Sequence, residues 1–231
     1  MPTNPSHGWR YIGVGPDHWL YIAIGAPCNV CESKLPYATI SRIKLNGKDF
    51  EVYAEGVRNS VGFDWDPVTK KLWFTDNGRD WMGDELPPDK LNNAPHAGMN
   101  FGFPYFYGDN KPDPEFGKMR SAKEMTPPAF ELEAHVASLG MRFYTGKMFP
   151  SQYHNQIFIA EHGSWNRSKK IGYRVVMITL KNDKPVSQKI VVSGWLQGDK
   201  YWGRPVDLLV MPDGSLLVSD DYAGVVYRIS Y

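Results

Sequence analysis

Residues 212–221 read PDGSLLVSDD, a tight turn followed by a short apolar strand that ends in acidic residues. Proline presets φ at one turn position, and Asp-Gly permits the positive φ that the next position requires. An apolar strand with a polar tip occurs three more times, as LYIAIG (20–25), LWFTDNG (72–78) and IFIAEHG (157–163). A pattern repeated in this way predicts one structural unit used several times.

Further predicted strands extend each repeat. A third strand follows the polar tip in three repeats, and a fourth follows in two of them. The third strands are 39–45, 175–180 and 225–229, and the fourth strands are 51–54 and 190–192. Four strands per unit are typical of a β-propeller blade. We therefore predict an all-β fold, a single propeller domain over residues 1–231, with units at 7–55, 56–130, 131–195 and 196–231. A sandwich of short strands would not repeat in this register, and a Pro- and Asn-rich insertion at 79–130 lengthens the second unit.

The composition supports a compact β domain and excludes some functions. The 231 residues are 42% hydrophobic and 14% aromatic, and they include 22 Gly and 18 Pro, as expected for short strands joined by turns. Lys and Arg (26) nearly balance Asp and Glu (25), so the basic surface of a nucleic-acid-binding protein is not expected. No apolar run approaches the roughly 20 residues of a membrane span.

The two cysteines, Cys28 and Cys31, form a CxxC motif. Glu32 follows in place of the histidine of a haem-attachment motif, and a second cysteine pair for zinc is absent. A redox pair, a short-loop disulfide and two free thiols remain open. We favour a structural disulfide, which would place the protein outside the cytosol.

Both ends of the chain differ from what a complete ring requires. The sequence begins directly at an inner strand and ends after the third strand of its last unit, which leaves sheet edges unpaired. We expect the chain to be the C-terminal part of a longer protein. The first residues contain neither a basic region nor an apolar stretch, so either there is no export signal or the native start is missing.

Polar residues at the ends of the strands are the functional candidates. His7, Arg58 and Arg204 enter three different units at equivalent positions, so they are expected to form a cationic pocket with a possible general base. Arginines in such a pocket suit a ligand with several carboxylates. The tip at residues 76–85 combines carboxylates with glycines, which suits a hard cation, and a solvated acidic turn is the alternative that the composition leaves open.

The sequence resembles the pyrroloquinoline-quinone (PQQ)-dependent sugar dehydrogenases, and within them the L-sorbosone dehydrogenase-type branch. The similar stretches cover nearly the whole chain in family order: 7–10, 15–17, 25–31, 56–59, 76–81, 100–104, 161–167 and 203–207. These enzymes are six-bladed propellers, so the resemblance implies that about four of six blades are present here. It also implies a periplasmic or secreted protein that passes electrons to a cytochrome or another external acceptor.

The resemblance assigns expected roles to individual residues. His7 is the expected general base, which takes a proton from the sugar hydroxyl while hydride moves to the quinone. Arg58, Asn59 and Arg204 are expected to contact the cofactor, and Arg167 or His162 could replace a family lysine. His135 and Trp81 are expected to contact the sugar. The backbone carbonyls of Gly78 and Arg79 are expected to hold the catalytic calcium, and Glu85 a second, structural calcium.

The departures from the family pattern leave the substrate open between an aldose and a sorbosone-like sugar aldehyde. Ser6 stands where the soluble glucose dehydrogenases have an acidic residue, and Val206 where they have a second arginine. Two other functions compete with the dehydrogenase: an inactive fragment or non-catalytic propeller, and a calcium-dependent propeller lactonase.

Overall fold

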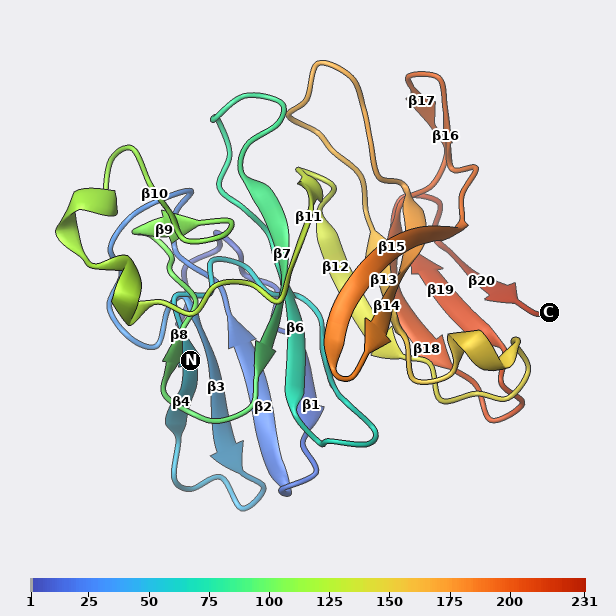
Figure 1. Ribbon diagram of the computed structural model, residues 1–231, viewed down its shortest axis with the longest axis horizontal. Coiled ribbons are helices and arrows are strands. Elements are labelled where there is room, and N and C mark those ends of the chain that lie inside the picture. Colours follow the sequence, from blue (N-terminus) through green and yellow to red (C-terminus); the bar gives the residue numbers. More distant parts are fainter. Residues whose placement is uncertain (1) are drawn as a thin grey trace.

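Four mainly antiparallel sheets follow one another along the chain in the computed structural model, which describes residues 2–231 (Figure 1). The first contains β1 (Ile12–Val14), β2 (Trp19–Ile24), β3 (Thr39–Lys44) and β4 (Glu51–Glu55). The short strand β8 (Met99–Asn100), from later in the chain, pairs parallel with β4 at the edge of this sheet. The second contains β5 (Phe63–Trp65), β6 (Leu72–Asp76), β7 (Pro88–Ala94) and β11 (Phe130–Ala134). The third contains β12 (Ser138–Phe143), β13 (Ile157–Glu161), β14 (Arg174–Lys181) and β15 (Lys184–Val192), and the fourth β18 (Pro205–Val210), β19 (Leu216–Asp220) and β20 (Val225–Ile229).

Smaller elements lie in the segments between these strands. The segment between β7 and β11 contains β8 (Met99–Asn100), β9 (Phe106–Tyr107), β10 (Lys111–Pro112) and the 3₁₀-helices η1 (Gly117–Met119) and η2 (Ala122–Glu124). The remaining elements are η3 (Ser151–Tyr153) and the hairpin of β16 (Leu196–Gln197) and β17 (Lys200–Tyr201). The expected all-β fold is therefore confirmed, and the number of blades in the complete ring stays a prediction.

The third strand of the second sheet was not predicted from the sequence. β7 lies inside the segment 79–130 that was interpreted as an insertion. Proline and asparagine are rare in strands, and this stretch contains two of each: Pro87, Pro88, Asn92 and Asn93. β11 completes the same sheet by pairing with β7, so the expected start of the third unit at residue 131 falls within the outer strand of the second. The long excursion from the sheet lies between β7 and β11.

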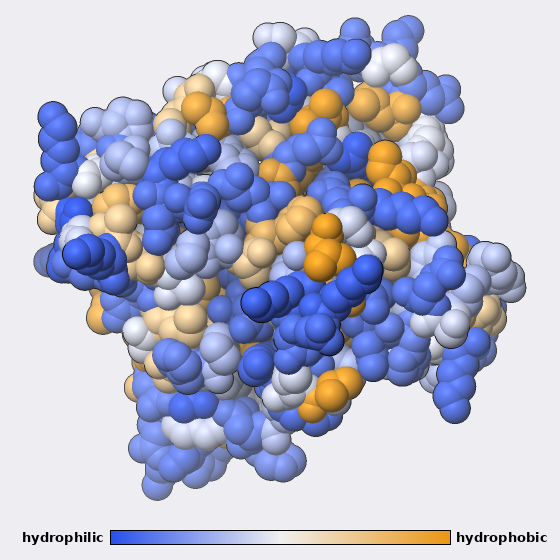
Figure 2. All heavy atoms as spheres, viewed as in Figure 1, coloured by the Kyte–Doolittle hydropathy of each residue, from blue (hydrophilic) through white to orange (hydrophobic). Residues whose placement is uncertain are grey.

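The strands of the second and third sheets are buried on both faces because each of these sheets packs between two others. In β13, Ile157 and Ile159 pack with the second sheet, whereas Phe158 and Ala160 pack with the fourth. The side chains of a strand alternate between its faces, so both sets must be apolar. This explains why the repeat contains continuous apolar runs. Figure 2 shows that the outer surface in this view is mostly hydrophilic, with scattered apolar groups.

Glycines allow the innermost strands of neighbouring sheets to approach closely. A Cβ atom on Gly62 would lie 2.3 Å from the carbonyl oxygen of Leu139 at the start of the third sheet. A Cβ atom on Gly140 would lie 2.6 Å from the Cα atom of Asp207 in β18. Both contacts involve backbone, which cannot move aside as a side-chain end can. The spacing between the inner strands therefore depends on these two residues.

Gly140→Ala is expected to lower the free energy of unfolding by about 1–3 kcal/mol, since the added methyl group meets fixed backbone. Gly13→Ala in β1 is the matched control, because its Cβ atom would meet the edge of the Phe63 ring at 3.0 Å, and that ring can shift. Denaturant unfolding of both variants measures the difference. Equal losses would contradict the importance of the β12–β18 approach.

Candidate functional site

Asp76, the last residue of β6, organises the segment that enters the second sheet. Its carboxylate accepts hydrogen bonds from the backbone N–H groups of Asn59 (2.7 Å) and Arg58 (3.3 Å). It is fully buried, and Lys90 Nζ lies 3.3 Å away as its charge partner. The backbone of residues 58 and 59 is therefore fixed at one end of the sheet.

The guanidinium of Arg58 is buried and bonded from several directions. Its Nε donates to the carbonyl oxygen of Asn29 (2.8 Å), and its Nη2 donates to Asn29 Oδ1 (2.8 Å) and Asp80 Oδ2 (3.2 Å). Its Nη1 donates to the carbonyl oxygen of Asn77 (3.3 Å). Burial lowers the pKa of Arg58, and the carboxylate of Asp80 opposes this effect. The positive charge of Arg58 therefore lies in the wall of the site, largely shielded from water.

His7 presents a free ring nitrogen beside this arginine. Its Nδ1 lies 2.8 Å from the carbonyl oxygen of Ala26. A carbonyl can only accept, so Nδ1 carries the proton in the neutral ring and Nε2 holds the lone pair. Burial, followed by the positive charge of Arg58, lowers the pKa of His7 from its usual 6.5. The imidazole is therefore neutral at pH 7, as a general base must be.

Hydrogen bonds join the second sheet to the third across the site. Asn166 Nδ2 donates to Asp80 Oδ1 (2.7 Å) and lies 3.3 Å from His135 Nδ1. His135 Nε2 lies 2.8 Å from the carbonyl oxygen of Gly83, so the proton of this ring is on Nε2 and Nδ1 accepts. Asp80 thus receives Arg58 on one oxygen and Asn166 on the other, which ties three loops together.

Asp89 in β7 makes a second connection between the same two sheets. Its carboxylate accepts from the N–H of Gly78 (3.0 Å) and from the N–H and hydroxyl of Ser138 (2.9 and 3.3 Å). Burial raises the pKa of Asp89 to about 6, because the hydrogen bonds offset only part of the desolvation. The backbone at Gly78 is thereby fixed in the wall of the site.

These residues surround a cavity of about 280 Å³ that is open to solvent. Its wall includes five of the residues predicted from sequence: His7, Arg58, Asn59, Gly78 and His135. It also includes residues that were not predicted, namely Asn77, Asp80, Asp89, Ala137, Leu139, Trp165 and Asn166. The sequence signal for most of these was present, since they lie in or beside the polar tips at 76–85 and 161–168.

The other predicted cofactor ligands lie outside this cavity. Arg204 donates to the carbonyl oxygens of His162 (3.1 Å) and Gly163 (2.7 Å), and His162 Nε2 lies 2.9 Å from Asp221 Oδ1. Arg167 donates to the carbonyl oxygen of Asp84 (2.6 Å). These side chains connect loops of neighbouring sheets.

Glu85 and Trp81 lie near the rim of the site. Glu85 is highly exposed, and its Oε1 pairs with Arg167 Nη2 at 2.7 Å. The Trp81 ring is exposed and packs edge-on against Trp165 with 5.4 Å between ring centroids. Trp165 itself lines the cavity, so Trp81 extends the aromatic wall outward.

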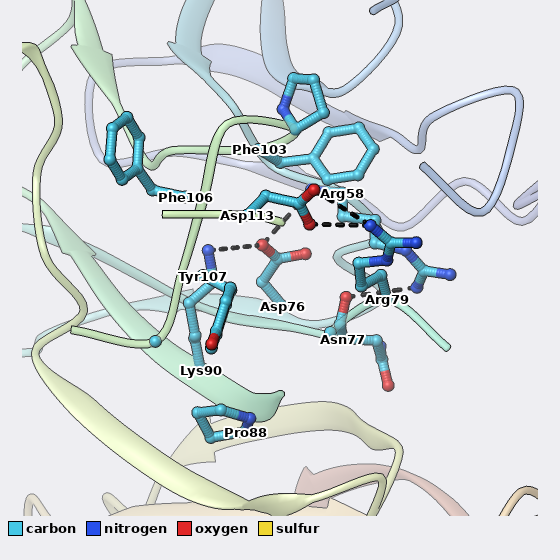
Figure 3. Close-up of a pocket in the computed structure, with 13 residues that line it drawn as sticks. Arg58, Asp76, Asn77, Arg79, Pro88, Lys90, Phe103, Phe106, Tyr107 and Asp113 are labelled. Atoms are coloured by element: carbon cyan, nitrogen blue, oxygen red, sulfur yellow. Dashed lines mark hydrogen bonds and ion pairs between the residues drawn. The ribbon is translucent and has the colours of Figure 1, made fainter. Parts of the chain in front are cut away.

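A smaller cavity of about 20 Å³ lies beside the main one, and it has room for about one water molecule (Figure 3). Arg79 lines it and pairs with both carboxylate oxygens of the buried Asp113, at 2.8 and 3.1 Å. Lys90 reaches Asp76 and the carbonyl oxygen of Phe101 (2.9 Å) from the opposite side. The long β7–β11 segment, which supplies Phe101 and Asp113, thus supports the site from behind.

Residues 41–228 match the family model described as "Glucose / Sorbosone dehydrogenase". The chain belongs to this family of sugar dehydrogenases. The resemblance found in the sequence is confirmed at the level of the family, and the sorbosone branch stays a prediction.

Two relatives and two solved structures show how far the likeness extends. The whole chain is 41% identical to 63% of an uncharacterised protein of Borreliella burgdorferi, and 81% of it is 26% identical to 46% of the aldose sugar dehydrogenase YliI of Escherichia coli. The chain therefore spans less than two thirds of these relatives. A Trichoderma reesei carbohydrate-active enzyme of family AA12 has a TM-score of 0.85 at 19% identity, covering 98% of this chain and 69% of that one. The holo PQQ domain of Coprinopsis cinerea pyranose dehydrogenase has a TM-score of 0.81 at 19% identity, covering 99% and 71%.

The charged groups of this sugar dehydrogenase family member do not by themselves form a metal centre. Within residues 2–231, no group of three His, Cys, Asp or Glu side chains is placed to hold a metal ion. The described helices include none that is long and apolar enough to cross a membrane.

Asp80→Ala is expected to destabilise the protein by about 3–5 kcal/mol, because it leaves the buried charge of Arg58 without its carboxylate partner. Glu85→Ala is the matched control: it also removes a carboxylate from an arginine pair, but the Glu85 side chain is 81% exposed, so a loss below about 1 kcal/mol is expected. Thermal and denaturant unfolding measure both. A small loss for Asp80→Ala would contradict the role of this ion pair.

Proposed function

We propose that the chain forms the catalytic part of a quinoprotein that oxidises a sugar or sugar aldehyde, with His7 as the general base. The proposal rests on one observation: His7 and the buried Arg58 line the same open cavity, and His7 Nε2 holds a free lone pair there. The family is one of sugar dehydrogenases, which supports the choice of an oxidation.

The groups in the cavity fit a carboxylate-bearing cofactor together with a cation. Arg58 offers charge-assisted hydrogen bonds, and the Asn59 side chain lies on the same wall. Since Asp80 already balances Arg58, a ligand with several negative charges needs an additional cation. Calcium would supply it, because it prefers oxygen ligands and the backbone at Gly78 and Arg79 offers carbonyls. Bound PQQ would supply the hydride-accepting chemistry that amino-acid side chains lack.

The chain's own residues would bind, orient and deprotonate the sugar. The Ala26 carbonyl holds His7 so that Nε2 receives the hydroxyl proton. His135 and the Trp81–Trp165 pair would contact the sugar, with the aromatic rings against its C–H groups. Arg58 and Asn59 would hold the cofactor. Arg204, Arg167 and His162 bond to neighbouring loops, and their contact with the cofactor stays a prediction. Glu85 as the ligand of a second calcium stays a prediction.

The remaining parts of the proposal concern the surroundings of the enzyme. Electrons would pass to a cytochrome or another external acceptor. A periplasmic or secreted location agrees with the disulfide between Cys28 and Cys31. The whole enzyme would include the part of the relatives that this chain does not span.

His7→Gln is expected to lower kcat about 10²–10⁴-fold while the affinity for PQQ changes little, since an amide cannot act as a base. Dye reduction with aldoses measures turnover, and absorbance titration measures binding. Because the pKa of His7 is lowered, the acidic limb of kcat/KM is expected below pH 6.5, with activity falling as the pH drops through the pKa of His7. Unchanged turnover in His7→Gln would remove His7 from the role of base.

Removal of calcium with a chelator is expected to abolish PQQ binding and dye reduction, and added calcium is expected to restore both. Lactone hydrolysis that needs calcium but no quinone would favour the competing lactonase function. A chain that is monomeric on gel filtration but binds neither calcium nor PQQ would favour an inactive fragment.

A further inference from the structure

The CxxC segment has a structural role that the proposed chemistry does not use. Cys28 and Cys31 are joined by a disulfide, so the favoured interpretation of the motif is confirmed. Cys28 and Val30 pack against a small buried cluster that includes Phe103. Asn29 lies between the two cysteines, and its side chain and carbonyl are directed at the functional site.

Asn29 makes four hydrogen bonds there. Its Oδ1 accepts from Arg58 Nη2 and from the N–H of Asp80, both at 2.8 Å. Its carbonyl oxygen accepts from Arg58 Nε at 2.8 Å, and its Nδ2 donates to the carbonyl oxygen of Asp80 at 3.2 Å. One residue thus holds the Nε–Nη2 edge of the guanidinium and the backbone of the residue that balances its charge.

The same loop also positions the proposed base. The carbonyl oxygen of Ala26 receives His7 Nδ1, and the N–H of Ala26 donates to the carbonyl oxygen of Arg58 at 2.7 Å. The loop from Ala26 to Cys31 therefore contacts both His7 and Arg58. The disulfide closes it over three residue steps, which leaves Asn29 few alternative conformations.

We propose that Asn29, held by the Cys28–Cys31 disulfide, is the positioning residue that fixes Arg58 for binding of the carboxylate ligand. Without the Asn29 side chain, Arg58 Nη2 and the N–H of Asp80 lose their shared acceptor, Oδ1. Arg58 Nε keeps only the backbone carbonyl of residue 29, and the guanidinium turns toward Asp80 or water. The ligand then has to reorder it on binding, and affinity falls. This inference rests on the proposed function for the identity of the ligand, and its geometry stands without it.

The test compares Asn29→Ala and the double variant C28S/C31S with the wild-type chain. PQQ binding in the presence of calcium, without sugar, is measured by calorimetry, and the pKa of His7 in the ligand-free protein by NMR. Affinity is expected to fall about tenfold, the loss typical of one hydrogen bond to a charged group. The pKa of His7 is expected to rise, because the charge of Arg58 that lowers it has moved away.

Two further variants separate positioning from general stability. Val30→Ala removes packing from the same loop and is expected to lower the melting temperature while leaving PQQ affinity and the pKa of His7 unchanged. Asn29→Gln keeps an uncharged amide oxygen that can accept from Arg58 Nη2, and it is expected to recover part of the affinity lost in Asn29→Ala. If Asn29→Ala does not fold, C28S/C31S and Asn29→Gln provide the same two measurements.

The outcomes distinguish this inference from the proposed function. Wild-type affinity together with an unchanged pKa of His7 in Asn29→Ala would overturn the positioning role. If the wild-type chain does not bind PQQ, the proposed function fails, and the NMR titration alone then decides the inference. A raised pKa of His7 in Asn29→Ala, with no change in Val30→Ala, would still support it.

Discussion

The burial of the Arg58 charge is the constraint on which the site depends. A guanidinium removed from water is costly unless its donors meet acceptors and its charge meets a carboxylate. Here Asn29, Asn77 and Asp80 provide them from the loops of two different sheets. Asp80 in turn receives Asn166 from a third sheet. The requirement to satisfy one cation therefore brings the loops of three sheets to the same place.

The sheets can meet these requirements only because their inner strands are held at a short, defined separation. Gly62 and Gly140 allow backbone to contact backbone, while the alternating apolar residues of β13 fill the space on both sides. A change in this spacing would move Asp80 relative to Asn166, and a hydrogen bond of 2.7 Å does not tolerate such a movement. The core packing and the geometry of the site are thus parts of one arrangement.

The sequence was sufficient to predict the elements that obey local rules. The repeated apolar strands coincide with β2, β6, β13 and β19, because turn chemistry and apolar runs are local signals. The sequence did not predict β7, because its prolines and asparagines carry no strand signal. Its backbone is held in the sheet by pairing with β6 on one edge and β11 on the other. Five predicted site residues line one cavity because equivalent positions of repeated units lie at the same end of their sheets.

Other features of the site depend on contacts between loops that are distant in sequence. The roles of Asn29 and Asn166 depend on which loop lies opposite them. Arg204 resembles a ligand-binding arginine in sequence, and in the structure it donates to backbone carbonyls. No local pattern contains that information.

The distribution of these residues along the chain has a consequence for folding. Each sheet is a meander of consecutive hairpins apart from the connection to β11 and the parallel pairing of β8 with β4, so most of its contacts close over short loops and can form early. The cavity combines residues as distant in sequence as His7 and Asn166, which meet only after three sheets have docked. The site therefore cannot form before these three sheets have docked. Partial unfolding of any one of the three sheets removes the site while the other two can persist, so ligand binding reports on the integrity of the whole arrangement.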